Sequence, residues 1–331
     1  MATSQDFVNW VCGTDLNHHF LKYALLAETR ALQMFAVGSV HPTIYFPEVK
    51  AFHICLPRRD EQDKISSVLY AFDEKIELNR RMNETLDTTA RAIFKDWFVD
   101  FGPTRAKMEG RAPYMASENW TLFPDRLDHE GRPEGWTIRP LDKIAEFLNG
   151  MALQKYPAGD GAFLPVIKIA QLRTGDCRSA DRASIDIPPS YIVDDGDILF
   201  SWSGSLLHRV WTGGRGALNQ HLFKVTPVEF EKWFVFYWIG HYMEQFRAIA
   251  ASKATTMGHI QRHHLAEANT IIPSDAVLKA ANTIIGPIFE KMVASQLESR
   301  TLTAARDVLL PEIMSGKIRM RDAETALGVA P

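Results

Sequence analysis

The feature of this chain that most constrains its fold is a seven-residue apolar repeat running from residue 61 to residue 98. Apolar residues at alternating steps of four and three form a narrow stripe, which a coiled-coil helix buries against a partner helix. We expect the helix to begin just after Pro57 and to end before Gly102, because proline and glycine mark helix boundaries. A helix of this length is a rod of ~57 Å at ~1.5 Å per residue. The predicted seam residues are Ile65, Leu69, Phe72, Ile76, Asn79, Asn83, Leu86, Ile93 and Trp97.

Two amides, Asn79 and Asn83, interrupt the apolar seam. A buried amide is best satisfied by one particular partner, so it fixes the register of a coiled coil at some cost in stability. If the two asparagines face solvent instead, the segment is an ordinary amphipathic helix. A second seam in the same phase favours the coiled coil.

That second seam belongs to an internal repeat with an offset of 216 residues. The offset carries Pro57 onto Pro273 and Ile44 onto Ile260, and it carries the first seam onto the second without a gap. Such a match over a long stretch indicates a duplicated unit, made of a globular part, a proline and a long helix. The second predicted seam contains Ile285, Ile288, Met292, Leu302, Leu309 and Ile313.

Composition narrows the class of protein. A chain of 331 residues with 46% hydrophobic residues is long enough for more than one buried core. No apolar run approaches the ~20 residues of a membrane span, and the N-terminal stretch lacks the order of a signal peptide. Cys12, Cys55 and Cys177 form no CxxC pair, which favours a reducing cytoplasm and argues against disulfides or a zinc site. The net charge of -3 gives no global sign of nucleic-acid binding, so such a function must rest on local patches.

The order of elements predicts an α+β chain, with one small mixed domain and two long helices. We expect a helix at 7–34, a loop at 38–47 and a strand at 51–56, followed after the first rod by a polar connector too broken for a regular element. Residue 1 corresponds to residue 217, so the first copy has no counterpart of about residues 135–216. The predicted parts are 1–57, the end of a first globular domain; 58–135, the first long helix and connector; 136–273, a complete mixed domain; and 274–331, the second long helix and tail.

Charge is unevenly distributed inside residues 136–273. Residues 198–228 and 245–266 contain no Asp or Glu, but they carry arginines, histidines, amides and hydroxyls. Such side chains suit phosphate contacts by Lys and Arg and base-edge contacts by Arg, Asn, Gln and Ser. The alternative is that they are turn residues and core tryptophans. The candidate DNA contacts, chosen from loops and charge, are Lys168, Gln171, Arg173, Ser201, Trp202, Ser203, Ser205, His208, Arg209, Asn219, Gln220, Thr255, Thr256, His259, Gln261 and Arg262.

Other chemistry finds less support in the sequence. The side chains of the pair His263 and His264 are expected to point apart on a helix, with no nearby Cys or Glu to complete a ligand set, so no metal site is predicted. Ser203 does not meet the GxSxG pattern of a hydrolase, and no base for it stands out. The chain has neither GxGxxG nor a Walker loop, so we expect no cofactor in it.

Several segments resemble the DNA specificity (S) subunit of type I restriction-modification systems. The resemblance covers nearly the whole chain, and its central motif is long enough to be specific. Asp73–Asn83 and Phe94–Phe101 look like the central region of that family, and Leu310–Ile318 looks like its C-terminal region. The shorter segments that resemble its target recognition domains are Gly38–Ile44, Gly196–Leu199, Ser203–Ser205 and Leu218–Phe223.

The resemblance implies a non-catalytic scaffold for recognising double-stranded DNA. In this family two target recognition domains each read one half of a split site, and two antiparallel coiled-coil helices hold them apart. A rod of ~57 Å would span at most about 17 base pairs at ~3.4 Å each. The partners implied are modification subunits, which bind S-adenosylmethionine and methylate adenine, and restriction subunits, which use ATP and Mg to translocate and cut DNA.

One departure from the family pattern concerns residues 1–57, which look like the C-terminal remnant of a first target recognition domain. The first half-site is therefore in doubt: the chain is inactive, forms a self-dimer with two complete domains, or is read from an incorrect start. A rival interpretation is a degenerate coiled-coil adaptor that binds partner subunits without reading DNA.

Overall fold

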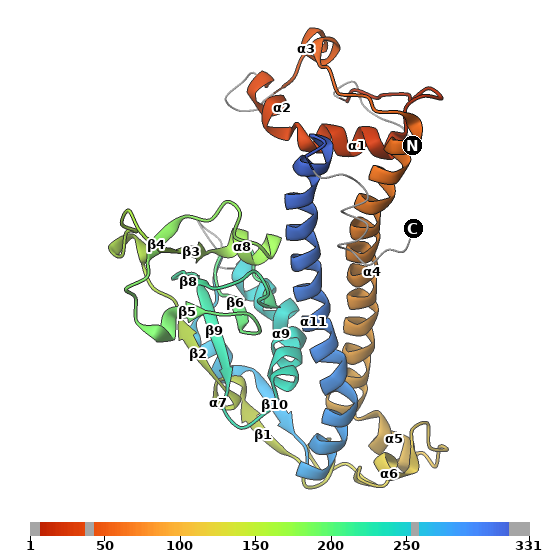
Figure 1. Cartoon of the computed structure of the whole chain (residues 1–331). Coiled ribbons are helices and arrows are strands. Elements are labelled where there is room, and N and C mark those ends of the chain that lie inside the picture. The colour runs from red at the N-terminus through yellow and green to blue at the C-terminus, as the bar shows by residue number, and fades with distance from the viewer. Residues whose placement is uncertain (1–6, 37–42, 253–257, 318–331) are drawn as a thin grey trace. The chain divides into compact units, whose positions relative to one another are not determined.

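The computed structural model describes residues 7–36, 43–252 and 258–317 of a mixed α+β chain. Two 40-residue helices, α4 (Arg59–Phe98) and α11 (Asp275–Met314), pack together (Figure 1). The predicted fold class is therefore confirmed. The chain divides into two compact units: unit 1 is residues 1–79 and 298–331, and unit 2 is residues 80–297. Each long helix contributes one part to each unit.

Unit 1 consists of short helices that pack on its parts of α4 and α11. Its core joins Phe20 and Tyr23 of α1 (His18–Ala27) to Ile65 and Leu69 of α4, and to Ile313 of α11. Two shorter helices follow α1 in the chain, α2 (Thr29–Phe35) and α3 (Phe46–Ala51).

Sequence reasoning was wrong about two local elements of unit 1. The helix expected at 7–34 begins only at His18, because the Asn17 side chain accepts the His19 and Phe20 N–H groups at 2.7 and 3.2 Å and so caps it there. The strand expected at 51–56 does not form, since α3 ends at Ala51 and the following residues have no regular structure. Part of the expected loop at 38–47 lies outside the described residues.

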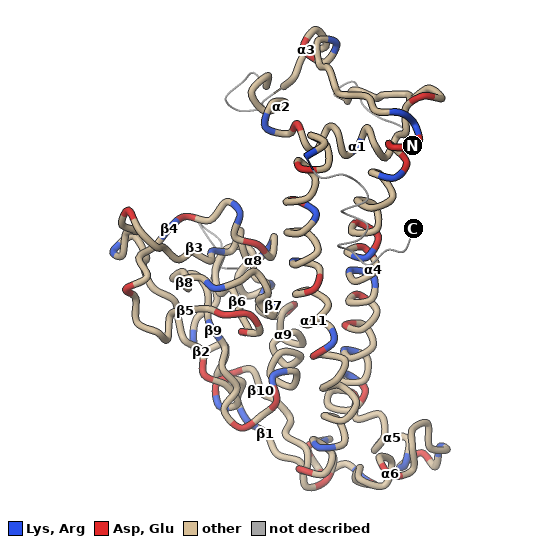
Figure 2. The backbone as a smooth tube through the Cα atoms, in the orientation of Figure 1, with Lys and Arg blue, Asp and Glu red and all other residues tan. Residues whose placement is uncertain are grey.

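Polar contacts show that the two long helices run antiparallel within unit 1. Asp73 of α4 pairs with Arg306 of α11 at 2.6 Å, whereas Asn79, further along α4, donates to Glu298 at 2.8 Å and to Ser299 at 3.3 Å. Asn79 is fully buried, so this amide faces the partner helix rather than solvent. Figure 2 shows acidic and basic residues interspersed along α4, as expected of its solvated face.

Every predicted seam residue is buried or half-buried in the structure. These residues are Ile65, Leu69, Phe72, Ile76, Asn79, Asn83, Leu86, Ile93 and Trp97 on α4, and Ile285, Ile288, Met292, Leu302, Leu309 and Ile313 on α11.

Among its described residues, unit 2 contains three antiparallel or mixed sheets. A two-stranded sheet pairs β1 (Thr137–Pro140) with β10 (Asn269–Ile272). A four-stranded sheet has the order β2 (Ala145–Asn149), β9 (Leu222–Pro227), β6 (Ile198–Ser201) and β7 (His208–Val210). The other four-stranded sheet has the order β4 (Arg182–Ser184), β3 (Phe163–Ile167), β8 (Gly216–Leu218) and β5 (Ile192–Val193).

Aromatic side chains of α9 (Lys232–Ser252) pack between the sheet and the two long helices, α4 and α11. Helix α9 packs beside α11 through Phe236, whose ring centroid lies 5.4 Å from that of Phe289, and against α4 through Trp238, 5.2 Å from Phe94. Its other face meets the sheet, with Phe246 5.8 Å from Phe200. The shorter helices of this domain are α7 (Leu141–Ile144), α8 (Ile169–Thr174) and α10 (Arg262–Glu267), with 3-10 turns at Leu153–Lys155 and Pro189–Tyr191.

The connector after α4 is more regular than its glycines and prolines predicted. It forms α5 (Gly102–Met108) and α6 (Ser117–Trp120). Phe123 packs edge-on against Trp97 with ring centroids 5.0 Å apart, and Tyr114 donates to Asp96 at 2.8 Å. These long-range contacts stabilise short helices that local propensity alone does not.

No helix in the described ranges is both long enough and apolar enough to cross a membrane. Cys12, Cys55 and Cys177 are not joined in disulfides.

Candidate nucleic-acid interface

The loop after β6 brings three distant segments of unit 2 together. Its Trp202 backbone accepts a hydrogen bond from Ile260 N at 2.9 Å and donates one to His221 O at 3.3 Å. Gly204 N donates to Gly258 O at 2.9 Å. The candidate residues near positions 202, 220 and 260 therefore occupy one region, as a DNA-contacting surface requires.

Trp202 lies at the centre of this region and is half-buried. Its indole Nε1 donates to Asn149 Oδ1 at 2.7 Å, and its ring centroid lies 5.8 Å from that of His221 and 6.5 Å from that of His259. A hydrogen bond and two ring neighbours hold the indole in one orientation.

The loop also places a base beside Ser203, contrary to the expectation from sequence. His221 Nδ1 lies 3.0 Å from Ser203 Oγ, and His221 Nε2 lies 3.4 Å from Gln220 Nε2. Sequence spacing could not reveal this pairing, because Ser203 and His221 follow different strands. Ser203 is only 3% exposed, and both ring nitrogens already face neutral groups, so the pair lacks the access and the orienting carboxylate of a catalytic triad.

Arg173 and Ser205 extend the region toward α8. Both are exposed, and Arg173 Nη2 donates to Ser205 Oγ at 2.7 Å. Lys168, at the start of α8, forms an ion pair with Asp181 on the surface.

Arg209 has a structural role that sequence reasoning missed. Its guanidinium donates to the carbonyl oxygens of Leu172 and Arg173 at 3.1 and 3.2 Å and so caps the C-terminal end of α8. Burial lowers the pKa of this guanidinium. A Cβ at Gly175 would lie 2.8 Å from Arg209 Nη1, so the arginine lies close against this turn.

Four further candidates have their polar groups inside the protein. Ser201 Oγ donates within its own loop, Gln171 accepts from Lys168 N at 3.3 Å, and Asn219 accepts from His221 N at 3.3 Å. The His208 ring lies tilted against Phe236 with ring centroids 4.6 Å apart, and burial, with Arg91 and Arg247 nearby, lowers its pKa to about 3. The polar groups of these side chains are therefore occupied within the protein.

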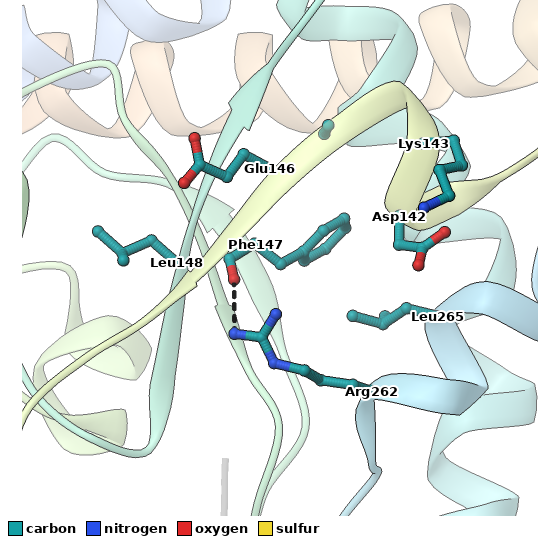
Figure 3. A pocket seen from close by; sticks show the side chains of 8 residues that line it. Asp142, Lys143, Glu146, Phe147, Leu148, Arg262 and Leu265 are labelled. Carbon is teal, nitrogen blue, oxygen red and sulfur yellow. Dashed lines mark hydrogen bonds between the residues drawn. The ribbon is translucent and has the colours of Figure 1, made fainter.

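The two candidates at the start of α10, Gln261 and Arg262, are exposed. Arg262 Nη2 donates to Phe147 O at 3.2 Å, and its guanidinium carbon lies 5.8 Å from the centroid of the Phe223 ring. Arg262 also lines a hollow of about 350 Å³ together with Asp142, Lys143, Glu146, Leu148 and Leu265 (Figure 3). The remaining candidates, Thr255 and Thr256, lie outside the described residues.

The histidine pair on α10 differs from the prediction. The rings of His263 and His264 lie only 3.9 Å apart by centroid, and Glu267 brings a carboxylate close, so that the three potential ligand atoms lie within 4.8 Å of one another. The rings converge because His264 Nδ1 turns back to accept the Gln261 N–H at 2.9 Å. Since that nitrogen already has a donor, and exposed acidic groups are common without an ion, we propose no metal here.

Comparison with known proteins identifies the family. The model of the type I restriction modification DNA specificity domain matches residues 1–88 and 133–304. The chain belongs to this family. It is thus a type I restriction-modification specificity subunit that recognises target DNA as part of a type I complex, and the family is non-catalytic.

Two curated relatives are similar along most of their length. The type I restriction enzyme MjaIX specificity subunit of Methanocaldococcus jannaschii is 26% identical over 97% of this chain and 74% of the relative. The HindI specificity subunit of Haemophilus influenzae is 24% identical over 89% of this chain and 74% of the relative. The crystal structure of an S subunit from M. genitalium has a similar fold, with a TM-score of 0.51, 16% identity and coverage of 90% of this chain and 73% of that one. The resemblance drawn from sequence is therefore confirmed.

Proposed function

We propose that residues 136–273 read one half of a split site in double-stranded DNA through a defined reading surface. The observation that carries this proposal is the convergence of loops from three distant segments around Trp202, where backbone hydrogen bonds fix them together. The reading surface consists of the candidates in this region whose side chains are exposed or half-buried: Arg173, Trp202, Ser205, Gln220, His259, Gln261 and Arg262.

The chemistry of the reading surface supports this role. Its arginines can contact phosphates or guanine, its glutamines can contact base edges, and its hydroxyl can contact either. The segments 198–228 and 258–266 that form most of it contain no Asp or Glu, so they carry no negative charge to repel the DNA backbone.

The partners follow from the family. We propose that the helix pair docks modification subunits, which bind S-adenosylmethionine and methylate adenine, and that restriction subunits with ATP and Mg complete the complex in the cytoplasm. A self-dimer is an alternative source of a second complete recognition domain.

Two arginines on the reading surface provide the test. Arg173→Ala with Arg262→Ala should weaken binding of a randomised duplex pool by the chain with its cognate modification subunit, because two cationic contacts are lost. Each lost phosphate contact should also reduce the slope of log K against log salt by about 0.9. Sequencing of the bound fraction should show a short half-site for the unaltered chain.

Arg139→Ala is the matched control. Arg139 is also exposed and its guanidinium carbon lies 5.8 Å from an aromatic ring centroid, that of Phe230, but it pairs with Glu229 and is not one of the reading-surface residues. Its removal should leave binding and the salt slope unchanged. Equal losses in both variants would place the DNA elsewhere, and enrichment of no sequence by the unaltered chain, with its subunits still assembled, would favour the adaptor.

A further inference from the structure

The loop between β8 and β9 and the loop after β6 together carry a chain of three polar side chains, Gln220, His221 and Ser203. Gln220 Nε2 lies 3.4 Å from His221 Nε2, and His221 Nδ1 lies 3.0 Å from Ser203 Oγ. We infer that Gln220 reads an adenine in the major groove and that His221 and Ser203 are positioning residues for its amide. This inference rests on the reading surface proposed above, of which Gln220 is a member.

The backbone beneath Gln220 is fixed on both sides. Asn219 N donates to Ile167 O at 3.2 Å, and the carbonyl of His221 accepts from Trp202 N at 3.3 Å. On a third side, a Cβ at Gly150 would lie 2.1 Å from Asn219 O, so this loop lies against backbone that has no room for a side chain. A side chain that reads bases is most selective when its support is rigid, and this loop supplies that support.

The proton positions follow from the order of the three groups. With the Gln220 amide oriented so that its nitrogen faces the ring, that nitrogen donates and His221 Nε2 accepts. The neutral ring then has its proton on Nδ1, which donates to Ser203 Oγ. One N–H of Gln220 is used in this way, and the other N–H and Oε1 remain to form an edge with one donor and one acceptor.

Such an edge matches adenine. In the major groove adenine presents the N7 acceptor beside the N6 donor, and glutamine pairs with both. Guanine presents two acceptors there, cytosine a donor and thymine an acceptor, so none of them satisfies both groups of a fixed amide. Because His221 holds the amide before DNA binds, less side-chain freedom is lost on binding.

The test measures base preference position by position. The full chain with its cognate modification subunit binds a randomised duplex pool, and the bound fraction is sequenced. Gln220→Ala should lower the preference for adenine at one position by about 5- to 150-fold, the range for one bidentate contact, and leave the other positions unchanged. Gln220→Glu should also lose adenine there, because a carboxylate has no donor for N7 and favours cytosine.

A second set of variants tests whether His221 positions the Gln220 amide. His221→Ala should weaken the same adenine preference, and the double variant should lose no more than Gln220→Ala alone, since His221 acts through Gln220. Gln154→Ala, which removes an exposed glutamine outside the reading surface, should leave this position unchanged.

Three outcomes would overturn the inference: unchanged preferences in both Gln220 variants, a uniform loss at all positions in both, or additive losses in the double variant. Failure of the proposed function is distinguishable from all of these, because the unaltered chain would then enrich no sequence.

Discussion

Equivalent positions on the two long helices hold their neighbours by different chemistry. In unit 1, Asp73 of α4 pairs with Arg306 at 2.6 Å and accepts from Tyr23 of α1 at 2.8 Å. The offset of 216 carries Asp73 onto Phe289 of α11, and it carries Ala90 onto Arg306. In unit 2, Phe289 is 6% exposed, and Ala90 is fully buried.

The two copies of the repeat keep the same packing position on the long helix but use different side-chain contacts there. In both copies a helix, α1 or α9, packs on the same position of a long helix: Tyr23 contacts Asp73, and Phe236 contacts Phe289 with ring centroids 5.4 Å apart. An aromatic contact depends little on pH, whereas a carboxylate with three hydrogen-bond donors depends on its ionisation. The two units should therefore respond differently to truncation and to acid.

The largest loss of stability is expected in unit 2, where the contact between the helices is aromatic. Phe289→Ala should destabilise unit 2 by about 3–5 kcal/mol, because it removes a buried ring and leaves a cavity. Urea denaturation followed by tryptophan fluorescence measures it, since Trp233 and Trp238 belong to the same core. Val308→Ala on the same helix, at a side chain 68% exposed, should change the free energy of unfolding by no more than about 0.5 kcal/mol. A cost below about 1 kcal/mol at Phe289 would contradict the packing described here.

The next largest loss of stability is expected at the residue before the proline, and it should differ between the two copies of the repeat. Leu56 and Ile272 correspond through the offset, but Leu56 is 53% exposed and Ile272 is 8% exposed. Ile272→Ala should cost about 2–4 kcal/mol, and Leu56→Ala about 0.5 kcal/mol or less. Chemical denaturation of the two variants measures this contrast, and similar costs would show that residues 52–57 pack as β10 does.

The same pair shows where sequence reasoning about the fold succeeded and failed. The apolar period predicted both long helices, because a seam about nine turns long at ~3.6 residues per turn is a strong signal. The strand expected at 51–56 was wrong, although its counterpart in the second copy is β10. Ile272 is in a strand because β1 pairs with it, with Thr137 opposite, and none of the named strands falls within residues 7–36 or 43–57. A strand depends on a partner that local sequence does not contain.

The candidate site was predictable in outline only. The absence of acids selected loops that the structure brings into one region, around Trp202, Gln220 and Arg262. Residue type alone could not separate Arg209, which caps α8, from the exposed arginines, because all of them are the same amino acid. His221 was not selected, although it directly follows Gln220, since its bond to Ser203 joins two loops.

The smallest effect is expected in the polar copy, and it depends on pH. Burial opposes ionisation of Asp73, but hydrogen bonds from Lys22, Arg306 and Tyr23 outweigh it and hold the pKa of this carboxyl below its usual 3.8. A depressed pKa contributes stability that is present above the usual value and is lost as the pH falls through the folded-state value. Asp73→Asn should therefore destabilise unit 1 by roughly 1 kcal/mol near pH 7, after allowance for partial exposure, and the difference should vanish in acid.

Hydrogen exchange of the α1 amides measures this effect, because α1 packs on Asp73 through Lys22 and Tyr23. Glu74→Gln, at the neighbouring exposed carboxylate of α4, is the control and should leave exchange unchanged from neutral pH to acid. Exchange that is equally sensitive to acid in the Asp73→Asn variant would assign the pH dependence of unit 1 to another carboxylate. The contrast with the aromatic contact at Phe289 would then rest on packing alone.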